Sequence, residues 1–214
     1  MEKAWIDYMK LYKERPAAFA PSDELKIILD YDQVLAFEKD SGRHIGVLYE
    51  SPYNILVVDL VQDPNGKRFA YERILPTVEK GGVVAIPIFE GKFVLLNQYR
   101  HAIRDYQYAF PRGFGENGIA AKANAQKELL EEIGANVLQI ETLGTIAVDS
   151  GLCGNMADAF VCVVDKVEVC PHYEGIKDVV LLSKEELNQW IEEGKINDSF
   201  SLSAYSLYMQ RRHD

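Results

Sequence analysis

The spacing of apolar and polar residues divides the first third of the chain into a helical stretch and a run of short strands. Residues 1–20 carry apolar side chains at helical spacing among lysines and glutamates, and Pro16 ends this pattern. Short β-rich runs separated by turn residues follow at 27–29, 33–37, 44–49, 55–61 and 69–75. We therefore expect a small N-terminal unit, residues 1–75, made of one helix and a strand meander. A meander of this size needs a partner sheet or a second subunit to be stable.

The remaining chain, residues 76–214, mixes strands and helices. A hairpin is predicted where Glu90-Gly91 joins the apolar runs 83–89 and 93–98. Further strands are expected at 137–148, 159–169 and 179–182, and helices at 119–133, 184–193 and 199–211. Strands with interspersed helices, but without regular βαβ alternation, predict an α+β fold with a mixed sheet flanked by helices.

Composition and charge narrow the class of protein. The net charge of −10 argues against a broad surface for nucleic acid or anionic membranes. The N-terminus lacks a secretory signal, and no stretch approaches the roughly 20 apolar residues of a membrane span, so we expect a cytoplasmic protein. Cys153, Cys162 and Cys170 form no CxxC pair, so we expect buried free thiols.

The most informative segment is the predicted helix at 119–133. Glu128, Glu131 and Glu132 stand at i, i+3 and i+4 and therefore share one helical face. Carboxylates this close repel one another unless a cation lies between them, and oxygen ligands suit Mg²⁺, with Mn²⁺ also acceptable. A glycine-rich loop precedes the helix, and its backbone can approach metal and phosphate closely. The alternative for the three glutamates alone is a solvated helix face.

At these residues the chain resembles the Nudix hydrolase family. The family signature has Gly, five residues, Glu, seven residues and then a nine-residue stretch that begins with Arg-Glu. Here Gly113 takes the first position and residues 127–135 take the last nine, without a gap. Two positions depart from the signature: Ile119 replaces the first Glu, and Lys127 replaces the Arg, keeping its charge but losing its planar fork. Nearby Glu116 is our candidate to replace the missing Glu in part.

The flanking segments resemble the ADP-ribose pyrophosphatase branch of this family. These are Gln98-Tyr99-Arg100, the tail around 194–198 and the small N-terminal β unit. The resemblance implies a mixed sheet sandwiched between helices. It also implies that Glu128, Glu132 and the carbonyl of Gly113 hold Mg²⁺, with Glu131 supporting them in catalysis.

The roles of the other candidate residues follow from the same resemblance. Glu174 lies where the branch carries a catalytic or metal-binding loop glutamate, and it is our candidate general base, with a plain loop residue as the alternative. Arg100, Arg104 and Arg112 are the candidates for phosphate contact by bidentate hydrogen bonds, with surface ion pairs as the alternative. Tyr106 and Tyr108 either stack on a base or pack in the core, and His101 is expected to be structural or exposed.

These observations together predict a Mg²⁺-dependent hydrolase that cuts the pyrophosphate bond of ADP-ribose or a related nucleoside diphosphate sugar. One alternative is a Nudix hydrolase of another substrate, such as a nucleoside triphosphate, coenzyme A or a dinucleotide. The other is a nucleotide-sensing Nudix domain without activity, which the changes at Ile119 and Lys127 would favour. We expect a homodimer formed through residues 1–75, because exposed strand edges seek partners.

Overall fold

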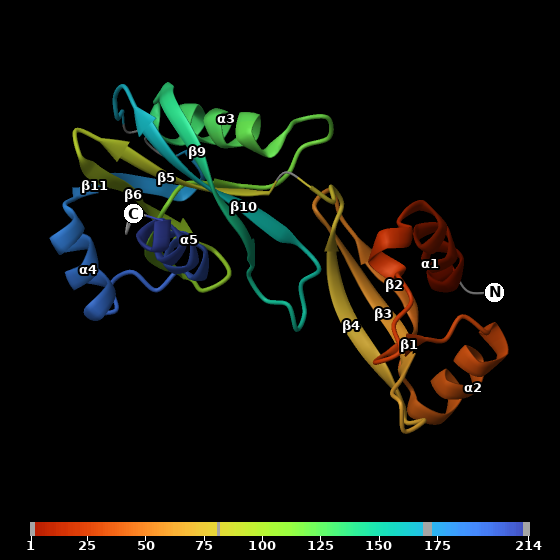
Figure 1. Ribbon diagram of the computed structural model, residues 1–214. Helices are drawn as coiled ribbons and strands as arrows, with labels where there is room; N and C mark the ends of the chain where they lie inside the picture. Colours follow the sequence, from red (N-terminus) through yellow and green to blue (C-terminus); the bar gives the residue numbers. More distant parts are fainter. Residues whose placement is uncertain (1–2, 81, 169–172, 212–214) are drawn as a thin grey trace. The chain divides into compact units, whose positions relative to one another are not determined.

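The computed structural model describes residues 3–80, 82–168 and 173–211. The chain forms two compact units (Figure 1). The first contains Met1–Glu79 together with Asp149–Asn155, and the second contains Lys80–Val148 and Met156–Asp214. The segment 149–155, which lies within our sequence range for the second unit, thus clusters with the first.

The first unit is a four-stranded antiparallel sheet with two helices. β3 lies inside the sheet: it pairs with β4 along one edge and with β2 and β1 along the other. The segment 149–155 extends this sheet beyond β4, since Ile74 donates to the Leu152 carbonyl and Gly154 donates to the Ile74 carbonyl. The elements are α1 (Lys3–Glu14), η1 (Pro16–Phe19), β1 (Lys26–Ile27), α2 (Tyr31–Ser41), β2 (Gly46–Glu50), β3 (Asn54–Gln62) and β4 (Arg68–Pro76).

The prediction of a strand at 33–37 is wrong, because these residues lie in the helix α2. Asp30 caps this helix by accepting a hydrogen bond from the Gln33 amide, and Gly42 ends it in the left-handed conformation. Val34 is the residue that the helix buries. The helix signals at the two ends therefore outweigh the β-rich composition between them. Of the run at 27–29 only Ile27 lies in a strand, the two-residue β1, whereas the later three runs lie wholly or mostly in β2, β3 and β4.

The second unit is built on a seven-stranded mixed sheet. Five strands follow the order β11-β6-β5-β10-β9, while β7 pairs with β6 and β8 pairs with β5. β5 and β10 run parallel, and the other pairs are antiparallel. The strands are β5 (Val83–Phe89), β6 (Lys92–Arg100), β7 (Asp105–Ala109), β8 (Arg112–Gly113), β9 (Val137–Ala147), β10 (Met156–Val164) and β11 (Ile176–Leu182).

Helices cover both faces of this sheet (Figure 1). α3 (Ala121–Ile133) packs on the face that carries Val83 and Leu96. α4 (Lys184–Glu192) and α5 (Ser199–Arg211) pack on the face that carries Val84 and Leu95. Alternate residues of one strand point to opposite faces, so the two helical layers share the same strands. The predicted α+β sheet between helices is confirmed.

The two short strands β7 and β8 were not predicted, and they shape the sheet next to the glutamates. β5 and β6 pair only at Ile88–Phe93 and Phe89–Lys92. Where these strands diverge, β8 pairs with β5 and β7 pairs with β6. The segment from 105 to 113 is thus inserted between two core strands, and it carries Gly113 to the start of the glycine-rich loop.

Two further expectations from the sequence can be compared with the described residues. Cys153 and Cys162 are free thiols, the second buried and the first half-buried, and Cys170 lies outside the described residues. Within the described ranges, every helix is too short or too polar to cross a membrane.

Candidate functional site

The glutamate helix α3 forms as its composition predicts. Its alanines favour the helix, and Gly134, with a φ of 61°, ends it in the left-handed conformation. Leu129 and Ile133 are fully buried against the sheet. Glu132 lies beside this apolar stripe and is only 2% exposed, while Glu128 and Glu131 are half-buried. A solvated glutamate face, our alternative, therefore does not describe Glu132.

Burial raises the pKa values of two of these glutamates. The pKa of Glu128 rises to about 7, first through burial and then through the negative charge of Glu131. The pKa of Glu132 rises to about 8, first through burial and then through Glu128, although Arg100 opposes the shift. Oε2 of Glu132 has no hydrogen-bond partner among the described residues. A buried carboxylate oxygen without a partner is costly when ionised, and a bound cation would remove that cost.

Gly113 brings the loop backbone directly against this cluster. A Cβ atom at this position would lie 1.9 Å from Oε1 of Glu128, a distance that no real structure allows. The absence of a side chain therefore lets the Glu128 carboxylate lie beside the Gly113 backbone. Among the described residues, no three His, Cys, Asp or Glu side chains converge to enclose an ion on their own. Mg²⁺ commonly binds through few carboxylates and completes its shell with waters and substrate phosphates, so the residues present fit such an ion.

Of the two positions that depart from the family signature, Ile119 lies just before α3 and Lys127 lies within it. Lys127 Nζ forms an ion pair with Glu116 and lies 3.5 Å from Oε1 of Glu131. The Ile119 amide donates to the carbonyl of Glu116, so the loop turns back at this point. Lys127 thus links a loop carboxylate to a helix carboxylate.

Two of the three candidate arginines lie with the glutamates. Burial lowers the pKa of Arg100, and the charge of Arg112 lowers it further, while Asp198, Glu132 and Glu174 oppose the shift. Nε of Arg100 is buried and has no partner among the described residues. The backbone of Arg112 hydrogen-bonds to Glu132.

The third candidate, Arg104, lies in the exposed turn between β6 and β7. Its guanidinium lies 3.0 Å from Nδ1 of His101, which is also exposed. The structure therefore brings Arg100 and Arg112 together with the glutamates, and it places Arg104 with His101 in this turn.

Glu174, the candidate general base, lies in η2 (Tyr173–Gly175), just before β11. It is exposed, and its φ of 44° places a non-glycine residue in the left-handed region. Its charge contributes to the raised pKa values of both Glu128 and Glu132, so it lies within electrostatic range of the cluster. Gln98 Nε2 donates to the Glu174 carbonyl at 2.9 Å and holds this strained backbone in place.

Comparison with known proteins identifies the family. No protein-family model matches the chain. It is 30% identical over 159 residues to the methanol dehydrogenase activator of Bacillus methanolicus, a match covering 72% of this chain and 84% of that one. It is 32% identical over 128 residues to the ADP-sugar pyrophosphatase of Mus musculus, and 32% identical over 82 residues to the ADP compounds hydrolase NudE of Escherichia coli. The chain belongs to the Nudix hydrolase family.

The extent of these matches differs. The mouse and Escherichia coli matches cover 54% and 38% of this chain, and the chain spans 59% and 43% of those relatives. A crystal structure of an ADP compounds hydrolase shares the fold, with a TM-score of 0.66 and 18% identity over 77% of this chain and 89% of that one. The resemblance to the ADP-ribose pyrophosphatase branch is confirmed, and the Nudix chain is a hydrolase.

Sequence reasoning missed several polar residues that this Nudix site buries. Gln98 is 2% exposed, and its Oε1 has no partner among the described residues. Asn124 is fully buried in α3, and its Nδ2 donates to the Phe114 carbonyl at 2.7 Å, which ties the loop to the helix. Asp198 and Ser201 are also buried. The signal available in the sequence was the pair of polar residues, Asn97 and Gln98, that directly follows the apolar Leu95-Leu96.

The two candidate tyrosines have different surroundings in the Nudix structure. Tyr108 packs edge-on against Trp190 of α4, with ring centroids 4.8 Å apart. Tyr106 is 50% exposed and packs against Tyr99, with Lys177 over its ring. Packing therefore describes Tyr108 well, whereas one side of Tyr106 meets solvent.

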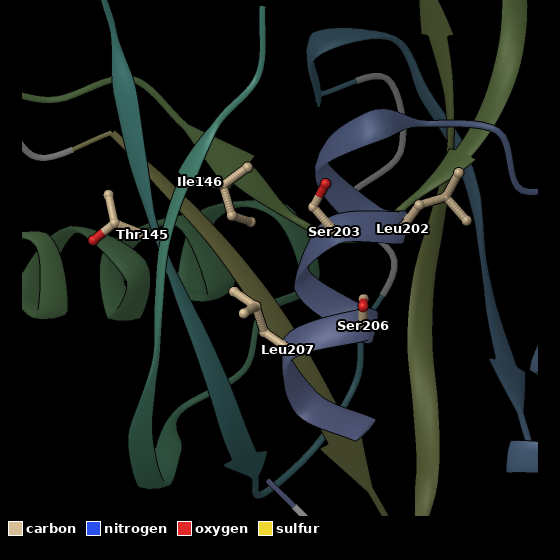
Figure 2. Close-up of a pocket in the computed structure, with 6 residues that line it drawn as sticks. All are labelled: Thr145, Ile146, Leu202, Ser203, Ser206 and Leu207. Carbon is tan, nitrogen blue, oxygen red and sulfur yellow. The ribbon is translucent and has the colours of Figure 1, made fainter. Parts of the chain in front are cut away.

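An open groove elsewhere on the second unit does not involve these residues. It lies between β9 and α5, as Figure 2 shows, and measures about 450 Å³. Its lining residues are Thr145, Ile146, Leu202, Ser203, Ser206 and Leu207. Apolar and hydroxyl side chains alone carry no charge with which to hold a metal or a phosphate.

Proposed function

We propose that this Nudix hydrolase cleaves the pyrophosphate bond of ADP-ribose or a related nucleoside diphosphate sugar in the presence of Mg²⁺, with Mn²⁺ as a possible substitute. The observation that carries the proposal is the half-buried Glu128 against Gly113 beside the buried Glu132, one of whose oxygens has no partner among the described residues. Two curated relatives are named as hydrolases of ADP sugars or ADP compounds, which supports this substrate class.

The metal ligands that we propose are the carboxylates of Glu128 and Glu132 and the carbonyl of Gly113. When bound there, Mg²⁺ would neutralise charge on the diphosphate and lower the pKa of a bound water. The raised pKa values of the two glutamates support this assignment, because a cation favours the ionised form that burial disfavours.

The chain's own residues would bind the substrate and move the proton. Arg100 and Arg112 would bind the phosphate oxygens, since the charge of Arg100 acts on Glu132 and the charge of Arg112 acts on Arg100. Arg104 would contact the substrate from the exposed turn. Glu174 would accept a proton from the attacking water, and Glu131, beside Lys127, would support the metal-binding carboxylates.

The test is a substrate panel of nucleotide sugars and nucleoside triphosphates, run with and without Mg²⁺ or Mn²⁺. We expect ADP-ribose to yield AMP and ribose 5-phosphate only when metal is present. Glu132→Gln should abolish turnover while the fold remains, because it removes a proposed ligand without changing side-chain volume. Near-normal turnover in this variant would contradict the assigned role. Pyrophosphate release would indicate a triphosphate substrate, and tight binding without cleavage would indicate a nucleotide sensor.

A second candidate function comes from the relative whose match covers 72% of this chain. That protein is named as an activator of methanol dehydrogenase. We propose, as the alternative, that this chain stimulates a dehydrogenase. Addition of wild type and of Glu132→Gln to a methanol dehydrogenase assay separates two routes. Stimulation by wild type alone would attribute the effect to hydrolysis, and stimulation by both would attribute it to binding.

We also propose that residues 1–75 mediate a homodimer. Among the described residues β1 and β2 each pair with one strand, β3, so their outer edges offer backbone groups of the kind that pair readily with another chain. Sedimentation at micromolar concentration tests this assembly, and a clean monomer would contradict it.

A further inference from the structure

A buried polar network joins the start of α5 to the segment that precedes Gly113. The Phe110 amide donates to Oγ of Ser201 at 2.8 Å, and the Ser201 hydroxyl donates to Oδ2 of Asp198 at 2.8 Å. The Ser201 amide donates to the same Asp198 oxygen at 2.9 Å. The second oxygen, Oδ1, lies 3.5 Å from Nη1 of Arg112. We call these four residues the Asp198 network.

Three of the four residues of the network are almost entirely shielded from water. Asp198 is 5% exposed, and Ser201 and Phe110 are each 1% exposed. A carboxylate buried to this degree needs partners for both oxygens. Ser201 satisfies one oxygen, which leaves the other for the guanidinium of Arg112. The Phe200 ring lies on the same guanidinium, 4.4 Å from its carbon, so Arg112 is held by a charge and by an aromatic face.

The Asp198 network adjoins the proposed metal site, because its residue Arg112 directly precedes Gly113 in the chain. Its Phe110 amide is followed by Pro111, whose carbonyl accepts from the Ala85 amide, and then by Arg112 and Gly113 in β8. Gly113 is the residue that the Glu128 carboxylate lies against. A shift of Phe110 would therefore move both the Arg112 side chain and the Gly113 backbone.

The network also sets the charge balance around the two arginines. The positive charges of Arg100 and Arg112 repel each other, and Asp198, Glu132 and Glu174 are the anions that attract Arg100. Of these three, we assign Glu132 to the metal and Glu174 to proton transfer. Asp198 remains as the anion without another assigned role, and it lies 3.5 Å from the Arg112 guanidinium.

We propose that Asp198 and Ser201 are positioning residues that hold the 110–113 segment and direct the Arg112 guanidinium toward the diphosphate of the substrate. This inference rests on the proposed function, since it assumes that Arg112 binds the diphosphate. A simple electrostatic role predicts the opposite outcome. If Asp198 were only a nearby negative charge, its removal would strengthen the binding of an anionic substrate.

The first experiment measures KM and kcat for Asp198→Asn and Ser201→Ala. We expect KM to rise roughly tenfold in Asp198→Asn, the equivalent of one lost charge-assisted contact, with a smaller change in kcat. In an Arg112→Ala background the same substitution should leave KM unchanged, because the group that it positions is gone. Ser183→Ala is the matched control. It removes the capping box of α4, whose bonds join Ser183 only to Glu186, and it should leave KM unchanged.

The second experiment does not depend on activity. Hydrogen exchange at the Phe110 amide should accelerate in Ser201→Ala and stay as in wild type in Ser183→Ala. If wild type hydrolyses nothing in the substrate panel, the proposed function fails, and this measurement still tests the network. If Asp198→Asn does not fold, Ser201→Ala retains the charge and still reports on the segment. A KM that is unchanged or lower in both variants, or an equal rise of KM in the Arg112→Ala background, would overturn the proposal.

Discussion

At the scale of single residues, the site is defined by one buried carboxylate, Glu132, and a half-buried neighbour, Glu128. Glu132 has a pKa of about 8 and Glu128 a pKa of about 7, against an ordinary value of 4.5. Between pH 4.5 and 8 the folded protein therefore binds more protons than the unfolded chain. Stability falls as pH rises wherever the folded state binds more protons, so these groups destabilise the metal-free protein at neutral and alkaline pH.

We accordingly expect the melting temperature of the metal-free protein to fall as pH is raised from about 5 to about 8.5. Glu132→Gln should flatten this fall, because a neutral amide does not have to ionise inside the protein. Added Mg²⁺ should also flatten it in wild type, since binding to the folded state stabilises it. The measurement is thermal unfolding in a chelator across this pH range. Identical slopes for wild type and Glu132→Gln would contradict the prediction.

Gly113→Ala tests the close approach of backbone and carboxylate. The added methyl would occupy the place of the Glu128 carboxylate, so that side chain must move. We expect metal-dependent turnover to fall by at least about tenfold, in line with the loss of one ordering interaction at a metal ligand. Gly118→Ala is the control within the same loop, because it strains a backbone with a φ of 80° but meets nothing within 4 Å. If turnover falls equally in both variants, strain in the loop alone explains the effect.

At the scale of elements, the signature helix and its loop were predictable because their signals are local. Spacing placed three glutamates on one face, and Gly134 marked the end of α3. The strands β7 and β8 were missed because they form by pairing with β6 and β5, and a local sequence pattern does not show such tertiary contacts. Burial of Asp198 was missed for the same reason, since its partner Arg112 is far away in sequence. The strand predicted at 33–37 failed because composition was weighed above the caps Asp30 and Gly42.

The junction of loop and helix gives a prediction at this scale. Lys127 pairs with Glu116 of the loop, whereas the family signature places its glutamate at the position of Ile119. We expect Glu116→Gln to reduce turnover modestly, and Ile119→Glu in that background to restore it by giving Lys127 a new carboxylate. Steady-state kinetics of the single and double variants measure the rescue, with Ile119→Glu alone as the control. A double variant no better than Glu116→Gln would show that Glu116 does not replace the missing glutamate.

At the scale of the whole molecule, the two units have separate cores and should have separate stabilities. The core of the first unit encloses one buried ionic cluster. Asp59 is 2% exposed, accepts the Tyr8 hydroxyl at 2.5 Å and binds Arg73 through both of its oxygens, at 2.6 and 3.0 Å. This cluster lies entirely within the first unit and shares no residue with the glutamates.

Asp59→Ala should therefore destabilise one unit selectively. It leaves the Arg73 guanidinium and the Tyr8 hydroxyl without their shared partner, and removing one member of a buried ion pair costs about 3–5 kcal/mol. We expect calorimetry to show a lower first transition, with the transition of the second unit retained, whereas Tyr8→Phe should cost only about 1 kcal/mol because it deletes one hydrogen bond. If residues 1–75 also carry the dimer contacts, Asp59→Ala should sediment as a monomer. A single transition that shifts as a whole would instead show that the two units unfold together, and that damage in the first unit is transmitted to the second.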